Sequence, residues 1–145
     1  MASVYETFWD HDTFAVVGHS AKKGFPLLTY RGLKDLDKTV IPVDPSAPEI
    51  DGDHAYTDFR SLPRSADAVV LEVPKEETRD WIVRAADAGI HDVWIHMGTE
   101  TPEALEVAEE RGLEALSGHC AVMYVTRGFT YHTLHKCFVK LVNRY

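Results

Sequence analysis

The stretch Gly18-His19-Ser20-Ala21-Lys22-Lys23-Gly24-Phe25-Pro26 holds the residues best suited to chemistry in this sequence. Glycine at position 18 lets the backbone turn tightly and come close to a ligand. Ser20 offers a hydroxyl donor, and Lys22 and Lys23 offer positive charge to a phosphate. A helix that starts behind this stretch adds unpaired N–H groups and a partial positive charge. The pattern therefore predicts a diphosphate site made of main-chain amides and lysine.

The stretch does not match the dinucleotide fingerprint GxGxxG. Ser20 stands at the second glycine position, and Gly24 comes one step after the third. A plain structural interpretation also stays open, in which Gly18 only ends a strand and the two lysines are solvated. The residues at the ends of the other strands are needed to choose between these interpretations.

The elements that position this stretch alternate along the chain. Short apolar runs rich in β-branched residues predict buried parallel strands, and amphipathic segments between them predict covering helices. The expected strands are 13–18, 39–43, 66–73, 92–98 and 113–116, and the expected helices are 27–36, 76–88, 102–112 and 131–145. The segment 46–65 is rich in Pro, Gly, Ser and Asp, which predicts a connection with about one helical turn.

This order predicts a single α/β domain over residues 1–145 with a three-layer, doubly wound parallel sheet that is Rossmann-like. In such sheets, ligands bind outside the carboxyl ends of the strands where the strand order reverses. The stretch after the first strand is therefore expected to lie at the ligand site.

Composition limits the class of protein. No apolar run approaches the roughly 20 residues of a membrane-spanning helix, and the first residues lack the basic start of a secretory signal. We therefore expect a soluble, cytoplasmic protein. The net charge of -8 opposes general binding to nucleic acid. Two cysteines, Cys120 and Cys137, are too few for a disulfide framework, so reduced thiols are expected.

Several stretches in this order resemble the stand-alone coenzyme A-binding domain proteins, whose domain also forms the N-terminal part of the succinyl-CoA ligase alpha subunit. The matching stretches span nearly the whole chain: FAVVGHSAKKGFP, VIPVDP, AVVLEVPKEET, DVWIHMGTETPEALEVAEERGLEAL and HCAVM. The resemblance implies a Rossmann-like fold that binds coenzyme A (CoA) or acyl-CoA, and binding rather than catalysis. The histidine of the larger ligases lies on a second domain, which is not expected here.

The resemblance also implies site residues at several strand ends. Phosphate would meet Gly18, His19 and Ser20, together with Lys22 or Lys23. The adenine and ribose would lie beside Val43, with Val73 and Pro74 as the next wall. Gly98 would leave space for the pantetheine arm, and Cys120 would lie beyond the fifth strand on the same edge. The family often has an acidic and a basic residue before that cysteine, where this chain has Gly118 and His119.

Other residues suggest other functions. Asp44 follows the second strand, where NAD-binding domains place an acid on the ribose, although it also suits a cap for the Pro45 turn. An NAD-dependent enzyme therefore remains an alternative function. A second alternative is a protein-interaction module whose nucleotide pocket is vestigial. A homo-oligomer or a protein partner is also possible. His132 and His135 have the spacing of two metal ligands, but no further ligand motif accompanies them, so no metal is expected. We find no catalytic constellation in the sequence, and we expect Cys120 to be unreactive.

Overall fold

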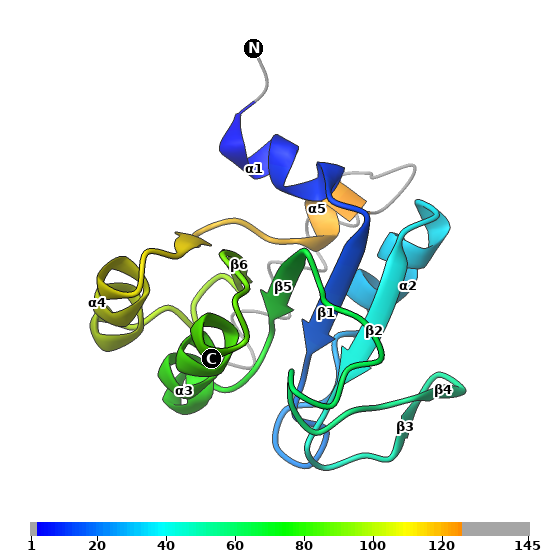
Figure 1. The fold of residues 1–145 in the computed structure, drawn as a ribbon. Coiled ribbons are helices and arrows are strands. Elements are labelled where there is room, and N and C mark those ends of the chain that lie inside the picture. The colour runs from blue at the N-terminus through cyan, green and yellow to red at the C-terminus, as the bar shows by residue number, and fades with distance from the viewer. Residues whose placement is uncertain (1–2, 126–145) are drawn as a thin grey trace.

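A five-stranded parallel sheet forms the centre of the computed structural model, which describes residues 3–125 (Figure 1). The strand order is β2-β1-β5-β6-β7. The strand bounds are Thr13–Val17 for β1, Thr39–Val43 for β2, Ala68–Leu71 for β5, Asp92–Ile95 for β6 and Glu114–Leu116 for β7. The chain leaves β1 toward β2 on one side and returns to β5 on the other. The strand order therefore reverses between β1 and β5, which confirms the predicted doubly wound α/β fold.

Helices cover both faces of the sheet (Figure 1). One face carries α3 (Lys75–Asp87) and α4 (Pro102–Glu110), and the other carries α2 (Leu27–Asp35) and α5 (Val122–Val125). The N-terminal helix α1 (Val4–Thr7) and the 3-10 helix η1 (Phe8–Asp10) lie on the α2 side, where Phe8 and Trp9 join its core. These two elements were not predicted.

Alternation along the strands divides the core between the two faces. Val17 and Leu71 pack on the α3 side, whereas Phe14, Val70 and Trp94 pack on the α2 side. All five residues of β1 and all four of β5 are buried, as expected for strands covered on both faces. The same alternation determines the face of the sheet on which each residue after a strand lies.

The connection between β2 and β5 differs from the prediction. It contains a two-stranded antiparallel hairpin, β3 (Glu49–Ile50) and β4 (Asp53–His54), in place of a helical turn. The turn residues Asp51 and Gly52 both have positive φ, at 53° and 86°. A two-residue Asp-Gly turn favours this conformation, so the hairpin signal was present in the sequence. Strands β5 and β6 also end earlier than predicted, at Leu71 and Ile95. The predicted final helix 131–145 lies outside the described residues.

Within residues 3–125, the structure has no helix with the length and apolar character needed to span a membrane.

Gly32 allows α2 and α5 to pack closely. A Cβ atom at this position would lie 2.7 Å from Val125 Cγ2 and 2.8 Å from the Val125 carbonyl oxygen. We expect Gly32→Ala to lower the free energy of unfolding by about 1–3 kcal/mol, because overpacking outweighs the better helix propensity of alanine. Urea denaturation measures this change. Adding Val125→Ala should recover part of the loss, and a Gly32→Ala variant more stable than the wild type would contradict the packing.

Candidate functional site

The loop between β1 and α2, residues 18–26, lies at the carboxyl end of β1, beside the point where the strand order reverses. This loop is called the β1–α2 loop below. The ends of β2, β5 and β6 lie at the same edge, because all these strands are parallel. The fold therefore brings together the strand ends that the sequence singled out.

Five main-chain amides of this loop donate hydrogen bonds within the protein. The Gly18 N–H donates to the Val43 carbonyl at 3.0 Å, and the Lys22 and Lys23 N–H groups donate to the His19 carbonyl at 2.9 Å. The Ser20 N–H donates to Asp44, and the Ala21 N–H donates to the Ser46 hydroxyl, each at 3.0 Å. These five amides are therefore not open to an anion, which differs from the amide site expected from the sequence.

Asp44 is the acceptor that shapes the β1–α2 loop. Its side chain is fully buried, and one carboxylate oxygen accepts from the N–H and the hydroxyl of Ser20. The other oxygen accepts from the N–H of Ser46 at 2.8 Å and from its hydroxyl at 2.7 Å. The prediction that Asp44 caps the Pro45 turn is confirmed. With both oxygens engaged and no exposed surface, Asp44 offers no acceptor to the ribose of NAD.

Two side chains of the β1–α2 loop, His19 and Lys22, connect it to α3. Glu77 Oε2 lies 2.7 Å from His19 Nδ1 and 2.9 Å from Lys22 Nζ. Burial raises the pKa of Glu77, but hydrogen bonds from Lys22 and His19 outweigh this effect and place the pKa below its usual value. Lys23 Nζ lies 3.4 Å from the Val73 carbonyl. The loop therefore presents Lys22 and His19 to the Glu77 carboxylate and Lys23 to the Val73 carbonyl.

Gly18 is required by packing within the protein. A Cβ atom there would lie 2.6 Å from Pro26 Cδ and 2.8 Å from Phe25 Cδ2. The other predicted site residues also follow strands at this edge. The side chains of Val43 and Val73 are fully buried in the core, so a ligand at the edge would meet their backbone. Pro74 precedes α3, and Gly98 follows β6 with open space at its Cα.

Cys120 lies just before α5 and is only 2% exposed. It is disulfide-bonded, so the expectation of a reduced thiol is wrong for this residue. A ligand contact by its side chain was predicted from the family resemblance alone. The geometry of the described residues does not add support for it.

Two residues that sequence reasoning missed, Glu72 and His96, lie at the ends of β5 and β6. Glu72 Oε1 lies 3.2 Å from His96 Nδ1, and the Thr29 hydroxyl of α2 donates to Glu72 Oε2 at 2.6 Å. A signal was available, since each residue is a titratable group directly after a run of apolar strand residues. Such residues need a polar partner when they are buried.

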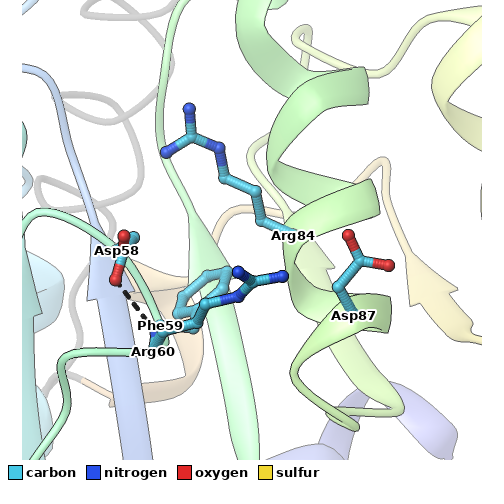
Figure 2. A pocket seen from close by; sticks show the side chains of 5 residues that line it. All are labelled: Asp58, Phe59, Arg60, Arg84 and Asp87. Atoms are coloured by element: carbon cyan, nitrogen blue, oxygen red, sulfur yellow. Dashed lines mark hydrogen bonds between the residues drawn. The ribbon is translucent and has the colours of Figure 1, made fainter.

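A hollow of about 230 Å³ lies elsewhere, between the connection that precedes β5 and the last turns of α3 (Figure 2). Asp58, Phe59, Arg60, Arg84 and Asp87 line it. None of the predicted site residues belongs to it, and its arginines are accompanied by acidic side chains. Among residues 3–125 no three His, Cys, Asp or Glu side chains are grouped to hold a metal ion. His132 and His135 lie outside the described part of the chain.

Comparison with known proteins agrees with this fold. The chain belongs to the family described as the CoA binding domain, whose sequence model matches residues 12–126. No curated protein matches the chain. A conserved hypothetical protein from Pyrococcus furiosus is 32% identical, with a TM-score of 0.67 over 77% of this chain and 97% of that one.

Two further solved structures are similar. A hypothetical protein from Pyrococcus horikoshii is 25% identical, with a TM-score of 0.71 over 82% of this chain and 84% of that one. A dinucleotide-forming acetyl-coenzyme A synthetase from Candidatus Korarchaeum cryptofilum is 20% identical, with a TM-score of 0.65. That match covers 83% of this chain and 30% of the synthetase, and it shows a shared fold.

The buried Asp44 carboxylate gives a first test of the site. We expect Asp44→Asn to lower the free energy of unfolding by about 1–3 kcal/mol, because an amide nitrogen would face buried donors. Hydrogen exchange at the Ser20 amide should also become faster. Asp58→Asn is the matched control, since Asp58 accepts similar local hydrogen bonds at the surface. Equal losses in the two variants would contradict the anchoring role of Asp44.

The lowered pKa of Glu77 predicts a dependence of stability on pH. A carboxyl group with a depressed folded-state pKa stabilises the protein above its unfolded value, here 4.5, and this contribution disappears as the pH falls through the folded value. The stability difference between wild type and Glu77→Gln should therefore be constant above pH 4.5 and shrink below it. Urea denaturation across this range measures the difference, with exposed Glu76→Gln as control. A stability difference that grows as the pH falls would contradict the lowered pKa of Glu77.

Proposed function

We propose that this protein binds coenzyme A, free or acylated, at the carboxyl edge of its sheet. The proposal rests on the position of Lys22 and Lys23, which lie where the strand order reverses in a CoA binding domain. The chain has a net charge of -8, so a local group of cations beside this edge stands out from its surroundings. Lys22 has a side chain that is 57% exposed and can reach a bound phosphate.

The internal hydrogen bonds of the β1–α2 loop amides determine how we propose that the phosphates are held. Because Asp44, Ser46 and the His19 carbonyl already accept from the β1–α2 loop, the phosphates of CoA would be contacted mainly by side chains. We propose the side chains of Lys22, Lys23 and His19 for this role. Ser20 and Gly18 would then act by holding the loop in place.

The remaining parts of CoA would follow the strand ends in either direction from β1. The adenine and ribose would lie toward β2 and the backbone of Val43. The pantetheine arm would pass the backbone of Val73 and then Pro74, toward the open surface at Gly98. Cys120 stays a proposed neighbour of this edge only through the family resemblance.

Calorimetric titration with CoA, acetyl-CoA and NAD tests the proposal. We expect CoA or acetyl-CoA to bind, and each of Lys22→Ala and Lys23→Ala to weaken binding by about tenfold or more, since a hydrogen bond to a charged group contributes about 1.5–3 kcal/mol. Lys38→Ala, which lies before β2 at the opposite edge, is the matched control and should bind as the wild type does. Tighter binding of NAD than of CoA would overturn the proposal.

The Glu77→Gln variant should change the affinity for CoA in the opposite direction. Removing this carboxylate releases Lys22 and His19 from their internal partner and removes a negative charge near the phosphates. We expect CoA to bind more tightly to this variant in the same titration. Weaker binding would mean that Glu77 is needed to hold the cations in place, and would contradict direct competition between Glu77 and phosphate.

A further inference from the structure

We propose that the ring of Tyr56 is the surface on which the adenine of bound CoA stacks. This inference rests on the proposed function, and it gives the adenine a side-chain partner in addition to the backbone of Val43. Tyr56 was not among the residues predicted from the sequence. It lies in the connection between β4 and β5, two residues after the end of β4.

The backbone of Tyr56 extends the carboxyl edge of the sheet beyond β2. Its N–H donates to the Pro42 carbonyl at 3.0 Å, and its carbonyl accepts from the Asp44 N–H at 2.8 Å. Tyr56 thereby forms an isolated parallel bridge with Val43. Because β1 occupies the other side of β2, Tyr56 lies two strand spacings, or about 10 Å, from β1. The ribose would span the interval between the phosphates and the ring.

The register places the side chain of Tyr56 on the α3 side of this edge. Partner residues on parallel strands lie on the same face, and the partners Val17 and Val43 both pack on the α3 side. Tyr56 is the partner of Val43 on its other side. Ala55, just before it, packs on the α2 side, as alternation requires. The ion pairs of Glu77 on α3 and the Tyr56 ring therefore belong to the same face of the sheet.

The surroundings of Tyr56 differ from those of the other described tyrosines. Tyr30 is buried in the core on the α2 side, and Tyr5 and Tyr124 pack against that core. Tyr56 is half-buried and belongs to neither core cluster of the described residues. Its ring meets the exposed His54 ring, with 4.6 Å between centroids and 79° between planes. An aromatic ring at the ligand edge and outside the core has surface to offer to a ligand.

Stacking suits the chemistry of adenine. A nucleobase has a flat π-face, and removal of an aromatic side chain that stacks on it weakens binding by about tenfold or more. In the part of the chain that the structure describes, the Tyr56 hydroxyl forms no hydrogen bond. Phenylalanine can therefore replace tyrosine here without leaving a polar partner unpaired. The role that we assign to Tyr56 belongs to its ring.

Proton NMR of the adenine tests the stacking directly. The two adenine ring protons of CoA are compared between the free ligand and its complex with the full chain. We expect both resonances to move upfield in the complex, because protons above an aromatic ring are shielded. Tyr56→Leu should remove most of this shift and weaken CoA binding by about tenfold in a calorimetric titration. Tyr56→Phe should keep both the shift and the affinity.

A second tyrosine–histidine contact provides the matched control. Tyr5 stacks on His119 with 3.8 Å between ring centroids. It lies in α1, at the end of the sheet opposite the β3–β4 hairpin (Figure 1). Tyr5→Leu should therefore leave CoA binding and the adenine shifts unchanged. Thermal denaturation checks that each variant is folded at the temperature of the titration.

The possible outcomes separate this inference from the proposed function. If CoA binds to the wild type but its adenine resonances do not move upfield, the inference is wrong and the proposed function stands. The same holds if Tyr56→Leu binds CoA as tightly as the wild type. If Tyr56→Leu does not fold, a nuclear Overhauser effect between adenine and the Tyr56 ring in the wild-type complex carries the test, and its absence overturns the inference. If CoA does not bind to the wild type, both are overturned.

Discussion

The carboxylate of Asp44 is the interaction on which the arrangement of the candidate site depends. It follows β2, yet it accepts from Ser20, which follows β1, and from Ser46 in its own turn. Because the group is fully buried, its charge is compensated by hydrogen-bond donors rather than by water. The β1–α2 loop is thereby tied to the neighbouring strand, and its Lys22 and Lys23 side chains contact Glu77 and the Val73 carbonyl.

Carboxylates of the chain engage donors all along this edge. Asp44 accepts from the β1–α2 loop, Glu77 accepts from His19 and Lys22, and Glu100 accepts from the Gly98 N–H at 2.9 Å. Glu72 accepts from Thr29 near the start of α2, where a helix favours negative charge. An anionic ligand therefore meets an edge whose donors have internal partners. The affinity that we propose for such a ligand would depend on Lys22 and Lys23 and on how easily the Glu77 ion pairs open.

The alternation of the strands separates two polar clusters at the same edge. Residues that follow the pattern of Val17 and Leu71 turn toward α3, and those that follow Val70 and Trp94 turn toward α2. Glu72 and His96 continue the second pattern, which explains why Glu72 meets Thr29 on α2 and not Lys22 or His19 beside Glu77 on α3. The Glu77 ion pairs and the Glu72–Thr29 hydrogen bond therefore lie on different faces of one sheet.

The sequence by itself determined the fold class, because short β-branched runs separated by amphipathic segments can bury their apolar surface only as a covered parallel sheet. It also determined which strand ends share an edge, since parallel strands place all carboxyl ends together. The Asp51-Gly52 hairpin was readable and was missed. Only the tertiary structure decided that the amides of the β1–α2 loop are engaged, that Asp44 faces inward, and that Glu72 meets His96. The Ser20–Asp44 and Glu72–His96 contacts each join residues 24 positions apart in the chain, and no local pattern encodes the direction in which such side chains point.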